Sequence, residues 1–223
     1  MMVRVRYRDD QLNVFKLTDI VNDDFPNALR ETFRRMWDRK FGSLWQLWDD
    51  SEAVRNLFWA EEGPKTKVPT HQSYEEWDCT ALFQATIFAQ SFALPDSTSR
   101  TGYKTLSDMY VKPVGLARGD FHASVVSSSG DYYETVALAI DQLRLLRNSV
   151  CHPVKGEMSK RTLNQHLQRV KDAFKALGLK TDKIDAISSE SGFFTSEVAD
   201  LERKIQNRDM AIKVLGIGVG LLK

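Results

Sequence analysis

The sequence has few cysteines, no long uninterrupted apolar run and almost no net charge. Its two cysteines, Cys79 and Cys151, are too few for the disulfide framework of a small secreted protein. The first residues are charged and lack the apolar stretch of a signal peptide. The apolar segment 211–222 is interrupted by Lys213 and is too short to span a bilayer. We therefore expect a protein of the cytosol or nucleus, with the cytoplasm preferred, and no membrane span.

The formal net charge of +1 over 223 residues argues against a protein that coats nucleic acid over its whole surface. Local charge is less even, because the segment from Cys151 to Lys183 holds eight basic and three acidic residues, a balance of +5. Such a segment is suited to holding phosphates. It is more often typical of the solvated face of a lysine-rich helix, and both interpretations stay open.

The cysteines and histidines are not arranged as ligands of a metal ion. The four histidines and two cysteines show none of the short paired spacings that zinc fingers use. We expect neither a metal nor another cofactor.

Helix-start residues and apolar stripes alternate along the chain, in a pattern that predicts an all-α protein. Amphipathic helices each hide one face, so several of them in succession favour an antiparallel bundle. Serine or aspartate stands where each helix is expected to start, and glycine or proline where most of them are expected to end. The predicted helices run from Asp24 to Gly42, onward from Ser51, from Ser73 to Pro95, from Asp131 to His152 and from Ser159 to Gly178.

We divide the chain into an N-terminal extension (1–24), a helical domain (25–180), and a linker with a C-terminal helical or coiled-coil tail (181–223). The connection 95–130 is long for a compact domain, and we expect one short helix in it, near residues 106–110. The tail carries spaced apolar residues among charges, which favours contact with a protein partner.

The likeliest working site is the string Arg147-Asn148 with His152, directly before Pro153. Arg147 falls on the apolar stripe of its predicted helix, so it should face the core and need a partner there. An Arg followed by a His after four to six residues arises readily by chance, but about 0.03 matches are expected once Asn must follow the Arg. A second Arg–His pair, Arg161 and His166, lies inside one helix, where residues five apart diverge.

A fixed cation, an amide and a titratable ring at a helix end suit phosphodiester cleavage in RNA. A neutral His takes the proton from a 2′-hydroxyl, and an Arg holds the phosphate oxygens. The basic residues near this motif that we expect to contact RNA are Arg144, Lys155, Lys160 and Arg161. A purely structural role, in which Arg147 and Asn148 satisfy carbonyls at the helix end, is an equal alternative. Cys151 is a poor candidate for a catalytic nucleophile. The His beside it is its neighbour in sequence, whereas the base that activates a nucleophile usually approaches from elsewhere in the fold.

The stretch from Leu138 to Gly178 resembles a HEPN domain, and Arg147-Asn148-x-x-x-His152 matches that family's Arg-x(4–6)-His motif. More narrowly, three blocks resemble the HEPN type of animal DAZ-interacting zinc-finger ubiquitin ligases, over about residues 25 to 180 in all. These blocks are Leu29-Arg30 through Trp48-Asp49, Trp77 through Phe83, and Leu143 through Pro153 followed by Met158-Ser159 and Leu177-Gly178.

The resemblance implies a helical bundle that forms a homodimer, with the two Arg/His motifs meeting at the interface. In catalytic members this arrangement is a metal-independent endoribonuclease, with Arg147 and His152 as catalytic residues and Asn148 in support. Many members of this type act instead as RNA-binding or protein-interaction adaptors in signalling or innate defence. The chain departs from the pattern in its long 95–130 connection and in Lys160, where an acidic residue is frequent. It carries no RING-type zinc cluster.

Overall fold

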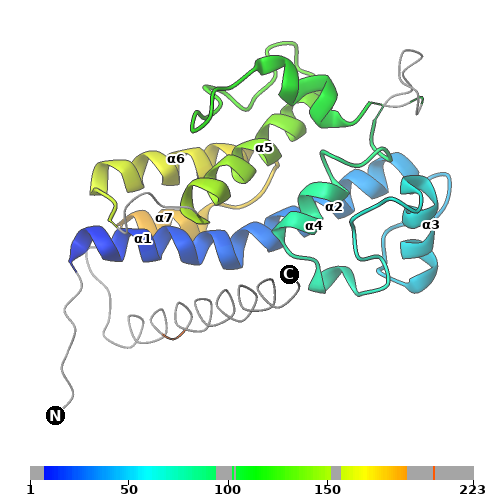
Figure 1. The fold of residues 1–223 in the computed structure, drawn as a ribbon, viewed down its shortest axis with the longest axis horizontal. Coiled ribbons are helices and arrows are strands. Elements are labelled where there is room, and N and C mark those ends of the chain that lie inside the picture. Colours follow the sequence, from blue (N-terminus) through cyan, green and yellow to red (C-terminus); the bar gives the residue numbers. More distant parts are fainter. Residues whose placement is uncertain (1–7, 94–101, 103, 152–156, 190–202, 204–223) are drawn as a thin grey trace, which may run out of the picture. The chain divides into compact units, whose positions relative to one another are not determined.

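The computed structural model describes residues 8–93, 102, 104–151, 157–189 and 203, and within these ranges it contains helices and no strand (Figure 1). The predicted all-α fold class is confirmed. The chain divides into two compact units, residues 1–184 and 185–223, and the description below concerns the first. The α-helices are α1 (Asp9–Asp19), α2 (Phe25–Phe41), α3 (Glu52–Glu62), α4 (Cys79–Ala85), α5 (Tyr132–Cys151), α6 (Lys160–Ala176) and α7 (Asp182–Ser189).

The helix expected to begin at Asp24 does not start there, because α1 and α2 are continuous through a π-helical turn at Ile20–Asp24. In that turn the Phe25 N–H bonds to the carbonyl of Ile20, five residues back. Pro26 has no N–H for a regular helical bond and its ring crowds the preceding turn. A widened turn directly before Pro26 accommodates the ring without breaking the helix.

Two local signals around α2 and α3 act as predicted. α2 ends at Phe41 with Gly42 as its C-cap, and α3 begins after Ser51, whose hydroxyl accepts the Val54 N–H. The two helices enclose an aromatic core centred on Phe33. Its ring centre lies 4.6 Å from that of Trp48 and 5.4 Å from that of Phe58, both nearly perpendicular to it.

The long helix predicted from Ser73 to Pro95 is wrong in length and in its starting residue. Ser73 caps only a 3₁₀ turn (Tyr74–Glu76), while the Asp78 side chain accepts the Ala81 N–H and starts α4, which ends at Ala85. Beyond α4 the backbone finds partners elsewhere, because the carboxylate of Glu62 accepts the N–H groups of Gln90 and Ser91. The segment is central, as expected from its apolar residues, since the side chains of Leu82, Phe83, Ala85 and Ile87 are all buried.

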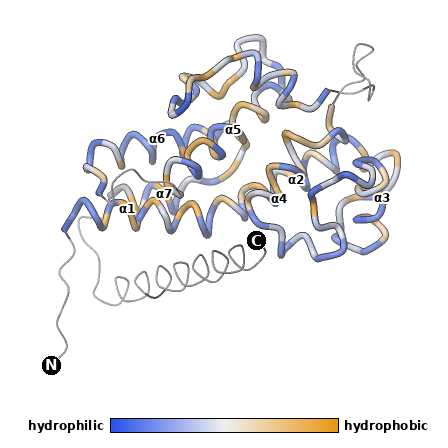
Figure 2. Tube along the Cα trace, in the orientation of Figure 1, coloured by the Kyte–Doolittle hydropathy of each residue, from blue (hydrophilic) through white to orange (hydrophobic). Residues whose placement is uncertain are grey.

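The helices α5 and α6 make the most extensive helix pair, and α1 packs against both (Figure 1). Asp131 accepts the Glu134 N–H at the start of α5, and Ser159 accepts the Thr162 N–H at the start of α6. Gly178 follows α6 with a positive φ of 68°, as its predicted role as a terminator requires. Figure 2 shows that much of α5 is apolar, whereas α6 is mostly hydrophilic with apolar residues at intervals. α6 therefore covers α5 and faces solvent on its other side.

The N-terminal helix is attached to the start of α6. The Met158 N–H donates to the carbonyl of Asp10, and the side-chain amide of Asn13 donates back to the carbonyl of Met158. In the connection before α5, a π-helical turn (Ser107–Val111) and a 3₁₀ turn (Lys112–Val114) occupy the place of the expected short helix. No helix in the described residues is both long enough and apolar enough to span a membrane.

Candidate functional site

Arg147 lies in the last turn of α5 and is half-buried, not sealed in the core as the apolar stripe predicted. The stripe itself is correct at Ile140, Leu143 and Val150, which are buried. Leu146 takes the core position in the last turn, and the neighbouring Arg147 is only partly covered. Its Nη1 donates to Oδ1 of Asn148 at 3.3 Å. Within the described part of the chain, Arg147 has no ion pair with a carboxylate.

Two of the predicted site residues, His152 and Lys155, lie outside the described residues. The site is therefore built here from the last turns of α5 and from the segments that pack beside them. The prediction that His152 approaches Arg147 stays a prediction.

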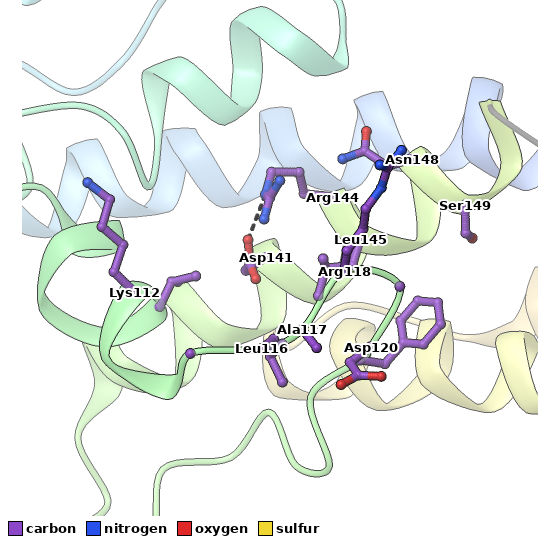
Figure 3. Close-up of a pocket in the computed structure, with 14 residues that line it drawn as sticks. Lys112, Leu116, Ala117, Arg118, Asp120, Asp141, Arg144, Leu145, Asn148 and Ser149 are labelled. Carbon is purple, nitrogen blue, oxygen red and sulfur yellow. Dashed lines mark hydrogen bonds and ion pairs between the residues drawn. The ribbon is translucent and has the colours of Figure 1, made fainter.

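A groove of about 910 Å³ runs along the exposed side of the C-terminal half of α5. Arg144 and Asn148, which are four residues apart on α5 and so share a helix face, both line it. The opposite wall is the connection between the 3₁₀ turn and α5; Figure 3 shows Leu116, Ala117 and Arg118 on the stretch that passes beside the helix. The residues that line the groove are Val111, Lys112, Gly115 to Phe121, Asp141, Arg144, Leu145, Asn148 and Ser149.

The groove carries three cationic side chains. Lys112 is exposed and pairs with Asp108, and Arg118 is exposed without an ion pair among the described residues. Arg144 is partly exposed and donates from Nε to Oδ1 of Asp141 at 2.6 Å (Figure 3). The wall thus offers guanidinium groups from two separate segments, a chemistry suited to phosphate or carboxylate oxygens.

A polar cluster lies buried beneath this wall. Asp141 and His122 have side-chain exposures of 1% and 2%, and Nε2 of His122 lies 2.8 Å from Oδ2 of Asp141. The His122 backbone N–H donates to Oε1 of Gln142, another buried side chain of α5. Asp141 thus connects a buried imidazole to a guanidinium that reaches the groove.

Sequence reasoning missed His122, Asp141 and Gln142. Asp141 stands three residues before Arg144, a spacing at which helical side chains pair, so that half of the cluster was visible in the sequence. His122 lies in the connection to which no structure could be assigned, and nothing local marks it as a partner of α5.

The other predicted RNA contacts are not part of the groove. Lys160 and Arg161 are exposed in the first turn of α6, and neither lines the groove. His166 of the second Arg–His pair is half-buried, and its ring centre lies 5.4 Å from that of Phe121, a groove residue. Burial, with a smaller contribution from the charge of Arg169, lowers the pKa of His166 to about 4. His166 is thus neutral at physiological pH.

Among the described residues, no group of three or more His, Cys, Asp or Glu side chains is arranged to hold a metal ion. Comparisons with protein-family models, with curated proteins and with solved structures found no match to the chain.

Proposed function

We propose that the chain is a HEPN-like RNA-processing domain that acts as a homodimer and cleaves single-stranded RNA without a metal ion. The observation that carries the proposal is the position of Asn148, which lines the groove and accepts a hydrogen bond from Arg147. This bond connects the predicted catalytic Arg to a solvent-open groove with further guanidinium groups. The cytoplasmic location expected from the sequence is part of the proposal, because RNA is accessible there.

The chemistry assigns one role to each side chain. Neutral His152 removes the proton from a 2′-hydroxyl, the 2′-oxygen forms a bond to the adjacent phosphorus, and the bond from phosphorus to the 5′-oxygen breaks. The leaving 5′-oxygen takes a proton from the protonated His152 of a second copy. Arg147 neutralises the charge that grows on the phosphoryl oxygens, and the products are a 2′,3′-cyclic phosphate and a 5′-hydroxyl.

The state of Arg147 supports this assignment. A guanidinium that served only to satisfy the end of α5 would be expected to donate to helix carbonyls, whereas the bond of Arg147 goes to a side-chain amide. Among the described residues this is the one hydrogen bond of its guanidinium, so the other donors of the fork are available to a ligand. In the described residues no carboxylate neutralises it, so its charge is available to a phosphate.

The test is a cleavage assay on fluorescently labelled single-stranded RNA in excess EDTA, with solution mass measured alongside. We expect a dimer that cuts RNA to products with a cyclic phosphate end. The Arg147→Ala and His152→Ala variants should each lower cutting by about a hundred-fold or more while their thermal unfolding stays unchanged.

Matched controls are Arg34→Ala and His71→Ala, which remove exposed side chains of the same types far from the groove in sequence and outside its lining. Both should cut RNA at the parent's rate. RNA that binds but is never cut would reject the catalytic part and leave the adaptor function, and a parent that does not bind RNA would reject the whole proposal.

A further inference from the structure

The cluster under the groove has an unusual composition for a helical core. Removing a carboxylate from water is costly unless its oxygens are paired, and at 1% exposure Asp141 depends on its two partners. Those partners differ in character, because His122 is as buried as Asp141, whereas the Arg144 side chain is 30% exposed and lines the groove. Among the described residues, Arg144 thus connects the buried pair to the ligand-accessible surface.

The geometry of Arg144 indicates that Asp141 orients the guanidinium and does more than neutralise its charge. Among the described residues, its one hydrogen bond runs from Nε to Oδ1 of Asp141, which holds the edge of the guanidinium nearest the helix. The two terminal Nη groups make no hydrogen bond among the described residues. Because the fork is planar and rigid, fixing Nε sets the direction in which both Nη groups point.

Asp141, which holds Arg144, is itself held in place by His122. Oδ2 of Asp141 faces Nε2 of His122, so the carboxylate has little freedom to rotate. The His122 backbone N–H is in turn bound to Oε1 of Gln142, which fastens this point of the 104–130 connection to α5. That connection also carries Arg118 on the opposite wall. The cluster therefore fixes the two walls of the groove relative to each other.

We propose that Arg144 is a fixed contact for a phosphate of the RNA backbone and that the buried Asp141–His122 pair positions it. The inference rests on the proposed function, since it names how the same groove holds its substrate. Asp141 and His122 are positioning residues that do not touch RNA. Arg144 contacts a phosphate other than the one that is cleaved, so its loss weakens RNA binding more than it slows cleavage.

Removing the charge of Asp141 has opposite effects on RNA binding in a positioning role and in a merely neutralising role. If Asp141 only offsets the charge of Arg144, replacing it by Asn makes the groove more positive and tightens RNA binding. If Asp141 positions Arg144, the same replacement weakens binding, although a negative charge has been removed. The two roles predict opposite signs for one measurement.

The experiment measures the dissociation constant of the full chain for a non-cleavable, 2′-deoxy-substituted single strand, over a range of salt concentrations. Arg144→Gln should weaken binding about ten-fold and reduce the slope of log K against log salt by about 0.7, the loss of one phosphate contact. Asp141→Asn should weaken binding at least about three-fold in the parent and have no effect in the Arg144→Gln background. A general loss of stability does not produce that coupling.

Because Asp141→Asn removes a buried ion pair, a second pair of variants covers the case in which it does not fold. His122→Gln keeps a donor toward Asp141 and should bind RNA as the parent does, whereas His122→Leu should weaken binding as Asp141→Asn does. A readout without RNA is the Nε–H resonance of Arg144, which should exchange slowly in the parent and rapidly in the His122→Leu variant.

Tighter binding by Asp141→Asn, an unchanged affinity of Arg144→Gln, or equal effects in both backgrounds would overturn the inference and leave the proposed function standing. A parent that does not bind the strand overturns both. Slow exchange at Arg144 in such a parent then shows that the cluster orders the side chain for some other purpose.

Discussion

Arg147 and Asn148 are neighbours in sequence, and the Nη1 of the first donates to the Oδ1 of the second, 3.3 Å away. Adjacent residues on a helix point about 100° apart, so this bond requires the long side chain of Arg147 to bend toward Asn148. The result is a guanidinium held at the edge of the groove that Asn148 lines. A bond of this kind adds little to the stability of the fold but fixes the orientation of the guanidinium. Its effect should therefore appear in ligand binding.

We expect Asn148→Leu to weaken RNA binding by about three- to ten-fold, because it keeps the volume of the side chain but removes the acceptor that orients Arg147. The dissociation constant for single-stranded RNA is the measurement. Ser149→Ala is the control, since Ser149 also lines the groove but its hydroxyl bonds to the carbonyl of Leu146. Equal affinities of Asn148→Leu and the parent would show that Arg147 does not depend on this bond.

Asp50 should be among the most sensitive positions for stability. It has a φ of 57°, and its carboxylate accepts from Arg55 Nη1 at 3.1 Å, from the Ser73 hydroxyl at 2.6 Å and from the Tyr74 N–H at 3.0 Å. We expect Asp50→Ala to lower the free energy of unfolding by about 3 kcal/mol, from lost hydrogen bonds and a left-handed backbone. Urea unfolding measures it.

Asp50→Gly separates the two causes, because glycine adopts this backbone freely but makes no side-chain bonds. It should be more stable than Asp50→Ala by about 1 kcal/mol and still less stable than the parent. If the alanine and glycine variants unfold at the same urea concentration, the backbone conformation at this position contributes nothing.

His166 should make the fold sensitive to mild acid. Its pKa is lowered in the fold from 6.5 to about 4, first by burial and then by Arg169. Below pH 6.5 the unfolded chain takes up a proton at this residue and the folded chain does not, so the unfolded state is favoured increasingly as pH falls toward about 4. The free energy of unfolding therefore has its full value above pH 6.5, and it falls as the pH is lowered from 6.5 to about 4.

The measurement is the difference in unfolding free energy between the parent and His166→Gln, taken from about pH 7.5 down to about pH 4.5, which cancels the contributions of other titrating groups. We expect the parent to lose stability relative to the variant as the pH is lowered. A difference that stays constant with pH would mean that His166 titrates alike in the folded and unfolded chains.

Gly178 should tolerate alanine less well than Gly115, although both have a positive φ, of 68° and 63°. A Cβ at Gly115 meets nothing within 4 Å, whereas a Cβ at Gly178 lies 3.1 Å from Nη1 of Arg35, which donates to the carbonyl of Leu177 at 2.7 Å. We expect Gly115→Ala to cost about 1 kcal/mol and Gly178→Ala about 2 kcal/mol, because the latter also displaces Arg35. Thermal unfolding of both variants checks the order, and equal costs would show that Arg35 moves aside freely.

Much of the helical architecture follows from the sequence alone, because helix ends are decided by groups only a few residues apart. The hydroxyls of Ser51 and Ser159 reach N–H groups three residues on, and Gly178 has the freedom to adopt a positive φ. The apolar repeat along α6 likewise specifies which face is buried. These features depend on spacing within one segment, so they can be predicted.

The tertiary structure decided what local spacing could not. The helix predicted from Ser73 to Pro95 is confined to Cys79–Ala85, and the carboxylate of Glu62, far away in sequence, binds the backbone farther along, at residues 90 and 91. His122 meets Asp141 only because the 104–130 connection folds back onto α5, and that meeting holds Arg144 in the groove. Long-range pairing depends on which surfaces pack together, and a cap or a periodic stripe carries no information about the partner. The sequence alone therefore determined the all-α class, several helix caps and the Arg147–Asn148 motif, and packing determined the groove beside that motif.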